Sequence, residues 1–358
     1  TRPANSSPDQ ATLWTSSGEE SYQLKTSEKE SRGTDITIFL NDENKEFADK
    51  SRVKFLLEKY SQYINFPLNL SEDNGDSDRV NESEALWLKP KSEISDTEYS
   101  DFYKFISYDQ NDPLLWIHNK VEGNNEYTNL LYIPKNPPFD LWNRESPRGV
   151  KLYIQRVFIM DDAEQFMPSY LRFVKGLLDS NDLPLNVSRE ILQDNKVTQA
   201  IRKGCTSRIL KMLERMAKNK AEDYQTFWNE FGQVIKEGPA EDFANKEKIA
   251  SLLRFATTET GEPAQNQSLA DYVARMKPDQ EKIYYVAADN HATAANSPHL
   301  EVFRAKGVEV LLLSDRIDEW LVGHLMDFDG KPLQDVAKGS LDLGEADPES
   351  KAAQAETE

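Results

Sequence analysis

Residues 282–314 read KIYYVAADNHATAANSPHLEVFRAKGVEVLLLS, and this stretch decides the fold class. Its two ends, KIYYVAA and VEVLLLS, are apolar over the length of a strand, which is typical of strands buried on both faces. The PHLEVFRAKG run between them has the pattern of a helix, and Gly307 at its end is a residue type that closes helices. A strand, a helix and a second strand in this order predict a parallel β-α-β unit, so we expect an α/β (α+β) fold.

The surrounding residues, 238–336, are predicted to form a small α/β subdomain. Ser268 and Asp271 have the spacing of a helix cap, and DRIDEWLVGHL (315–325) has the pattern of a further helix. No glycine follows the KIYYVAA strand, so backbone could not approach a pyrophosphate there, and a dinucleotide site is not expected.

A larger α/β subdomain is predicted over residues 85–237. Its strongest strand predictions are EYTNLLYIP (126–134) and GVKLYIQRVFIMD (149–161). Ser95 and Glu98 form a capping-box pattern at the start of a helix.

Helices are predicted for much of the rest of this subdomain. DAEQFMPSYLRFVKGLLDS (162–180) is expected to lead by helix into the next segment, and a long helical region ends at KEGPAED (236–242). The long helical region carries apolar stripes made of Ile209, Leu210, Leu213, Met216, Tyr224, Phe227, Trp228 and Phe231.

The N-terminal residues 1–70 have the pattern of the end of a domain. Short alternating runs up to GTDITIFL (33–40) predict a β-meander, and a helix is expected over 47–64 before a return to strand. Residues 71–84 contain few apolar side chains, so they are predicted to be a charged linker between domains. Since the sequence starts at Thr1 without a methionine, we expect a fragment of a longer protein.

Composition narrows the class of protein. The chain has 62 acidic and 43 basic residues, a net charge of -19, which disfavours binding to a nucleic-acid backbone. No stretch approaches the ~20 apolar residues of a membrane span, and no signal peptide is visible. The single cysteine, Cys205, is predicted to be a buried free thiol in a reducing cytoplasm. The four histidines are dispersed, so no metal site is expected.

The run DLPLNVSREILQDN (182–195) carries the main candidate for chemistry. Apolar and polar residues alternate up to Val187, and Ser188 is a natural N-cap for the helical pattern that follows. Arg189 and Gln193 are four residues apart and would point the same way on that helix. The pair would suit an arginine finger with a positioning partner, acting on a phosphate held elsewhere. The alternative is an ion pair between Arg189 and nearby carboxylates.

Longer runs resemble a known family. KLYIQRVFIMDDAEQFMPSYLRFVKGLLDSNDLPLNVSREILQDN (151–195) strongly resembles the middle domain of the ninety-kilodalton heat-shock (Hsp90) chaperones. Supporting runs are RGTDITIFL, ALWLKPKSEI, NDPLLWIHNKVEG, LLYIPKNPPFDLWN, TFWNEFGQVIKEGPAED, LLRFATT, KIYYVAAD and SPHLEVFRAKGVEVLLLSDRIDEW. The resemblance covers nearly everything from about Gly33 to Val336.

The resemblance implies a homodimeric, ATP-driven chaperone whose nucleotide sits in an N-terminal GHKL-type ATPase domain. Arg189 and Gln193 match the family's middle-domain catalytic loop, in which the arginine reaches the γ-phosphate of ATP. Residues 1–70 would be the end of the ATPase domain, as a β-α-β remnant, and Thr34 matches a threonine that helps to bind adenine. The ligands of the Mg²⁺ that accompanies ATP would lie outside this chain, which should therefore be inactive alone.

The resemblance also implies the rest of the architecture. The large subdomain would be of the ribosomal-protein-S5-like type, joined through a helical linker to the small one. Residues 337–358 would be an acidic tail that leads to a dimerisation domain outside this chain.

Client contacts are carried over in the same way. Trp87, Phe158 and Trp320 match middle-domain residues implicated in client binding, with Glu319 beside Trp320. Trp320 lies at the edge of a core stripe on its predicted helix and can be partly exposed. For Phe158, in an alternating strand, a place in the core is an equal alternative.

The first hypothesis is therefore a segment of an ATP-dependent cytoplasmic chaperone that uses Arg189 on ATP and exposed aromatic residues on clients. Its expected partners are unfolded or partly folded proteins, its own N-terminal domain, a second protomer and other chaperones. The alternative is a passive protein-binding scaffold with no part in catalysis.

Overall fold

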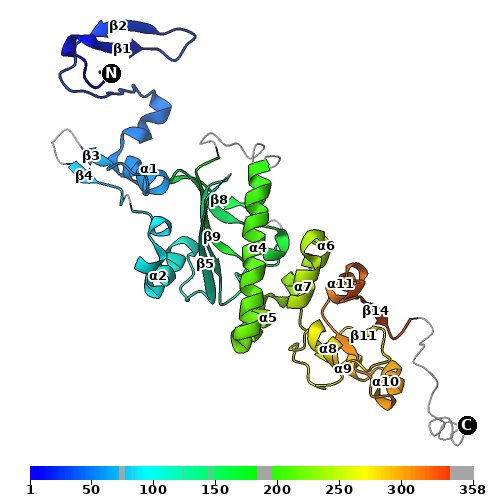
Figure 1. Cartoon of the computed structure of the whole chain (residues 1–358). Coiled ribbons are helices and arrows are strands. Elements are labelled where there is room, and N and C mark those ends of the chain that lie inside the picture. Colours follow the sequence, from blue (N-terminus) through cyan, green and yellow to red (C-terminus); the bar gives the residue numbers. More distant parts are fainter. Residues whose placement is uncertain are drawn as a thin grey trace, which may run out of the picture. The chain divides into compact units, whose positions relative to one another are not determined.

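The computed structural model describes residues 1–71, 77–82, 84–123, 125–143, 146, 148–183 and 196–338 (Figure 1). It separates into two compact units. The first comprises Thr1–Leu57 with Asn69–Asp78, and the second comprises Glu58–Leu68 and the chain from Arg79 onward. The finer domain boundaries near residues 237 and 337 stay predictions.

The first unit contains a hairpin rather than a meander. Strands β1 (Ala11–Thr15) and β2 (Gln23–Ser27) pair antiparallel, whereas residues 33–40 form no strand apart from a single bridge between Gly33 and Arg2. The expected third strand is therefore wrong, because an alternating run becomes a strand only where another strand pairs with its backbone. Ile36 and Phe39 are 82% and 93% exposed.

The order after this hairpin also differs from the expected β-α-β remnant. Helix α1 (Lys50–Ser61) follows as predicted, but β3 (Asn69–Ser71) pairs with β4 (Ser77–Arg79) and not with the first hairpin. The predicted linker 71–84 thus contains a strand, since backbone pairing in a hairpin does not require apolar side chains.

The second unit is built around a five-stranded sheet in the order β5-β6-β9-β7-β8. All neighbours are antiparallel except β7 and β9, which are parallel. The strands are β5 (Leu115–Val121), β6 (Tyr127–Ile133), β7 (Val150–Ile154), β8 (Val157–Ala163) and β9 (Lys175–Ser180). The two strongest strand predictions are confirmed, but the second is two strands, which turn at Gln155 and Arg156 with positive φ angles.

Successive residues of the central strands face two different hydrophobic cores. Leu131 and Leu178 belong to the main core together with helix α4 (Lys196–Asn219), which lies along this sheet (Figure 1). Leu130 and Leu177 belong to a second core with helix α2 (Asp96–Ser107). This period-two alternation places α4 and α2 on opposite faces of the sheet.

The helix predicted over 162–180 is wrong. The structure has two short 3-10 turns, η5 (Glu164–Phe166) and η6 (Ser169–Leu171), followed by β9 at the centre of the sheet. A strand buried on both faces is continuously apolar, so periodicity does not separate it from a buried helix. At Gly176, with φ +133°, an added Cβ would lie 2.1 Å from the carbonyl oxygen of Leu130.

The small sheet has the order β10-β12-β11-β14-β13. The predicted parallel pair is confirmed, because β11 (Ile283–Ala287) pairs parallel with β12 (Leu311–Leu313), and Gly307 ends the intervening helix with φ +57°. The other strands are β10 (Ala256–Thr257), β13 (Asp327–Phe328) and β14 (Lys331–Asp335). The remaining elements are short turns and helices along the whole chain. They are η1 (Pro8–Gln10), η2 (Asp42–Ala48), η3 (Leu86–Leu88), η4 (Lys91–Glu93), α5 (Ala221–Ile235), α6 (Gly238–Glu241), η7 (Phe243–Asn245), α7 (Lys246–Leu252), α8 (Leu269–Arg275), α9 (His291–Ala295), η8 (Pro298–Leu300), α10 (Glu301–Ala305) and α11 (Asp318–His324).

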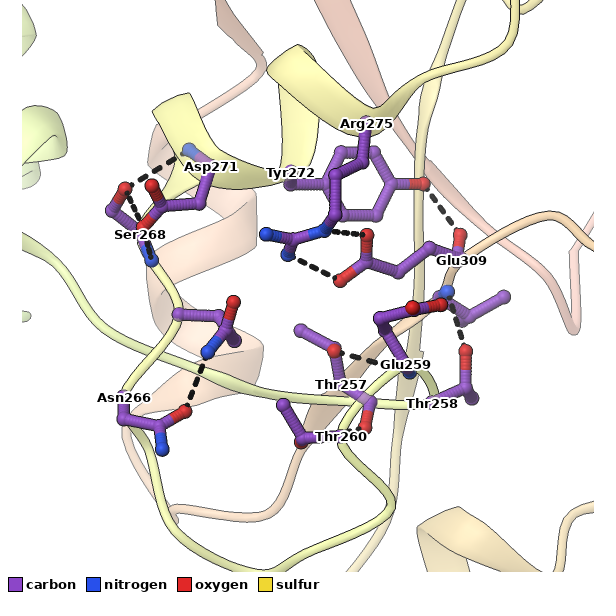
Figure 2. Close-up of polar contacts among 12 residues, drawn as sticks. Thr257, Thr258, Glu259, Thr260, Asn266, Ser268, Asp271, Tyr272, Arg275 and Glu309 are labelled. Carbon is purple, nitrogen blue, oxygen red and sulfur yellow. Dashed lines mark hydrogen bonds and ion pairs between the residues drawn. The ribbon is translucent and has the colours of Figure 1, made fainter.

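The two helix starts that the sequence predicts from capping patterns are confirmed. Ser95 and Glu98 form the capping box of α2, and Ser268 and Asp271 form that of α8. Figure 2 shows the second box beside the ion pair of Arg275 with Glu309, whose nearest atoms are 2.8 Å apart. No helix in the described ranges is long and apolar enough to span a membrane.

Cys205 is buried on α4, as predicted, and burial raises the pKa of its thiol to about 11. Its sulfur accepts a 3.3 Å hydrogen bond from Asn129. A thiol with this pKa is almost entirely protonated near neutral pH and is a poor nucleophile.

His118 on β5 gives the fold a predictable pH dependence. Its Nδ1 and Nε2 each lie 2.8 Å from a partner, the Tyr99 hydroxyl and the Trp87 carbonyl oxygen. The carbonyl can only accept, so Nε2 carries the proton and the neutral ring satisfies both contacts. Burial lowers the pKa of His118 below its ordinary value of 6.5.

The unfolded chain takes up a proton at this histidine more readily than the folded chain does. The stabilising contribution of neutral His118 is therefore present above pH 6.5 and is lost as the pH falls from there towards the lowered folded-state pKa. Urea unfolding at pH 7.5 and 5.5 should show a larger loss of unfolding free energy in the wild type than in His118→Gln. Equal losses in both proteins would contradict this assignment.

Candidate functional site

The two predicted catalytic residues, Arg189 and Gln193, lie in 184–195, outside the described residues. The predicted N-cap, Ser188, lies there too. The structure does describe the residues before this segment, from the end of β9 to Leu183, and the start of α4 at Lys196. The contacts that can be described are therefore those of the residues directly before this segment, which we call its base.

The base of the segment is held by hydrogen bonds and by burial. The Ser180 hydroxyl oxygen accepts from the backbone N–H groups of Asp182 and Leu183, each at 3.3 Å. A carboxylate oxygen of Asp182 accepts from the backbone N–H of Glu126. Leu183 is buried in the main core, which fixes the chain directly before the segment that contains Arg189.

Thr34, the candidate adenine contact, lies in the first unit. It is exposed, and its hydroxyl oxygen lies 2.6 Å from that of Thr1. Its role in nucleotide binding stays a prediction.

Trp87 is part of the core in this structure. Its side chain is 1% exposed, and its ring packs at 4.7 Å and 5.0 Å from the ring centroids of Tyr63 and Tyr153. The indole N–H donates a 2.8 Å hydrogen bond to Asp179, a buried carboxyl on β9. A client could touch the Trp87 ring only if the ring left this core.

Phe158 belongs to the same aromatic cluster. It is 8% exposed, lies edge-on to Tyr153 at 5.6 Å and packs against Tyr60 at 5.7 Å. Of the two alternatives for Phe158, the structure supports a place in the core.

Trp320 and Glu319 lie on α11 and are both exposed, Trp320 to 40%. Leu321 on the same helix and Leu325, which caps its C-terminal end, are buried, and this leaves Trp320 at the edge of the apolar stripe as predicted. The Trp320 ring lies 4.7 Å from the His324 ring, and nothing within 4 Å would meet a side chain at Gly323. The surface available to a partner is therefore an aromatic edge with a carboxylate beside it.

Several buried polar arrangements were not predicted from the sequence, among them those of Asp179 and Lys236. Asp179 accepts from Trp87, and burial raises the pKa of this carboxyl above its usual range. Lys236 is buried among Asp315 and Asp318. The apolar helix before KEGPAED (236–242) indicates only that Lys236 starts near the core, because its partners Asp315 and Asp318 lie too far along the chain to be found from the sequence.

Comparison with known proteins gives consistent matches. A family model described as Hsp90 protein matches residues 71–358. The chain is 63% identical to the chaperone protein HtpG of Pseudoalteromonas translucida over 96% of its length, and 58% identical to that of Shewanella pealeana over 99%. It spans 57% and 58% of the length of these two relatives.

A solved structure, the middle domain of a Plasmodium falciparum heat shock protein, is also similar. The TM-score is 0.65 at 31% sequence identity, over 71% of this chain and all of that one.

Proposed function

This chain belongs to the Hsp90 family, and we propose that it is part of an ATP-driven molecular chaperone that binds incompletely folded proteins. In this proposal Arg189 acts on the γ-phosphate of ATP, which a separate N-terminal domain holds together with Mg²⁺. Trp320 and Glu319 contribute to the client surface. The homodimer, the cytoplasmic location and contacts with other chaperones are parts of the same proposal.

The exposed aromatic edge of α11 is the observation that supports the client-binding part of this proposal. Trp320 is 40% exposed although its helix neighbours Leu321 and Leu325 are buried. The exposed part of the Trp320 side chain leaves apolar area that a partner can cover, and tryptophans are enriched among residues that dominate binding energy. A carboxylate beside it adds preference for segments that also carry positive charge.

The hydrogen bonds and burial directly after β9 support the catalytic part of the proposal. Ser180, Asp182 and Leu183 hold the chain where the segment with Arg189 begins. A rigid base limits the freedom of a guanidinium beyond it, and pre-organised charges are what phosphoryl transfer requires.

The exposed apolar residues of the first unit fit the assignment of residues 1–70 to the end of a larger domain. Trp14, Ile36 and Phe39 are exposed by 60% or more in this unit, whose described strands form two separate two-stranded hairpins. Large apolar side chains exposed together usually mark a surface that another part of a protein covers.

Trp320→Ala in the full-length protein should weaken binding to a permanently unfolded reporter, such as reduced, carboxymethylated α-lactalbumin. We expect about a tenfold loss of affinity, equivalent to ~1.4 kcal/mol, with little change in melting temperature. Fluorescence anisotropy of the labelled reporter measures the first and calorimetry the second.

Trp142→Ala is the matched control, because Trp142 is a tryptophan that is also largely exposed. It should leave binding unchanged. If Trp320→Ala binds the reporter as tightly as the wild type does, the client role of Trp320 is rejected. A large drop in the melting temperature of this variant would mean that Trp320 belongs to the core.

A further inference from the structure

Lys236, the C-cap residue directly after α5, is fully buried. Its ammonium nitrogen lies 2.7 Å from a carboxylate oxygen of Asp315 and 2.7 Å from one of Asp318. A third polar neighbour, the side-chain oxygen of Gln265, lies at 3.4 Å. The ammonium thus donates hydrogen bonds to Asp315 and Gln265 and forms ion pairs with both carboxylates, which match its positive charge.

The pKa values of the two carboxyls shift in opposite directions although both groups face Lys236. Burial raises the pKa of Asp318, and the pull of Lys236 does not offset it. Burial acts on Asp315 in the same direction, but the charge of Lys236 with the hydrogen bonds from Lys236 and Gln265 outweighs burial and lowers the pKa of Asp315. A buried charge without its partner is strongly unfavourable, so the geometry of Asp315 and Asp318 depends on Lys236 staying between them.

Both carboxylates lie at the start of α11. Asp318 is the first residue of the helix, and its second oxygen accepts from the backbone N–H of Asp315 at 2.9 Å. The Asp315 carboxylate also accepts hydrogen bonds from the side-chain amides of Gln233, at 3.3 Å, and Gln265, at 2.9 Å. The first turn of α11 is thus attached to the end of α5 by polar contacts in a buried setting, and Trp320 lies within that turn.

The residue after Lys236 is attached on the other side. Glu237 accepts two hydrogen bonds from the guanidinium of Arg172, at 2.6 and 2.8 Å, and both side chains are buried. Arg172 follows η6, in the connection that leads directly into β9. Consecutive residues at the end of α5 therefore bind α11 and the connection into the large sheet.

We propose that Lys236 is the positioning residue of α11, and that its ion pairs with Asp315 and Asp318 fix the helix turn that presents Trp320 and Glu319. Without the ammonium, the two carboxylates repel each other and turn towards water, and the start of the helix changes its orientation. The consequence for client binding rests on the proposed function, whereas the orientation of α11 does not.

Fluorine NMR of the fluorotryptophan-labelled 358-residue chain tests the orientation directly. The six tryptophans give separate probes, and the Trp320 resonance is assigned with Trp320→Phe. In Lys236→Met the resonance of Trp320 should shift or split, as should that of Trp228, whose ring lies 5.9 Å from the ammonium. The resonances of Trp116, on strand β5, and of Trp87, in the second core, should stay in place.

Arg275→Met is the matched control, since it breaks the ion pair of Arg275 with Glu309 in the same subdomain (Figure 2) but leaves α11 untouched. It should not move the Trp320 resonance. If Lys236→Met does not fold, Asp318→Asn removes one charge at nearly constant shape and should shift the same resonance. An unmoved Trp320 resonance in a folded variant, or an equal disturbance of all tryptophans, would overturn the proposal.

Client binding provides the second readout. In the full-length protein, Lys236→Met should weaken binding to reduced, carboxymethylated α-lactalbumin by about the same tenfold factor as Trp320→Ala, and the double variant should be no weaker than either. If Trp320→Ala itself leaves binding unchanged, the proposed client role fails while the resonance shift still decides the positioning role. A double variant whose losses simply multiply would contradict positioning through Trp320.

Discussion

Arg189→Ala in the full-length protein is expected to lower the rate of ATP hydrolysis by about 10²–10³-fold, or ~2.7–4 kcal/mol of transition-state stabilisation. An arginine that meets a transferring phosphoryl group stabilises charge that spreads over its oxygens in the transition state, and removing such a contact costs at least this much in other nucleotide hydrolases. ATP affinity should change little, because the proposed nucleotide site lies in another domain. Single-turnover hydrolysis with excess enzyme separates the chemical step from binding and release.

Two further variants sharpen this test. Arg189→Lys keeps the charge but loses the planar fork of donors, so it should recover only part of the rate. Arg202→Ala removes an exposed arginine of α4 and should leave hydrolysis unchanged. Wild-type rates in Arg189→Ala, with normal folding, would support the passive scaffold instead.

Trp87→Ala is expected to destabilise the chain by about 3–5 kcal/mol, the usual cost of deleting a large aromatic side chain from a core. The ring fills the space among Tyr63, Phe102 and Tyr153. Its loss also leaves the buried Asp179 without its indole donor, a cost of ~1–3 kcal/mol that places the expected loss at the upper end of this range. Chemical unfolding monitored by circular dichroism measures the difference.

Trp87→Phe separates the two contributions, since it retains most of the ring packing but not the hydrogen bond. It should be intermediate in stability. A loss below about 1 kcal/mol in Trp87→Ala would show that the ring spends its time outside the core, where a client could reach it, and would contradict the packing described above.

Local signals in the sequence predicted the helix starts and the small sheet. Ser95 with Glu98 and Ser268 with Asp271 cap helices by contacts within four residues, so no tertiary information is needed to find them. The parallel pair of β11 and β12 was recognisable because both strands are buried on both faces and therefore uniformly apolar.

Features that depend on distant partners were not predictable in this way. The apolar run of β9 predicts a helix as readily as a strand, and what makes it a strand is its pairing with β6 and β7, which lie elsewhere in the sequence. The burial of Lys236 depends on Asp315 and Asp318, about eighty residues further on. A family resemblance suggested a contact role for Trp87, but a role carried from relatives contains no information about burial in this chain.

The most direct test of the proposed shared ATP site is a structure of the full-length protein with a bound ATP analogue. The distance of interest joins the guanidinium of Arg189 to the γ-phosphate. The account predicts hydrogen-bond contact, roughly 2.7–2.9 Å between nitrogen and oxygen, in the closed state. A closed structure in which Arg189 instead pairs with carboxylates of its own domain, well beyond reach of the phosphate, would contradict it.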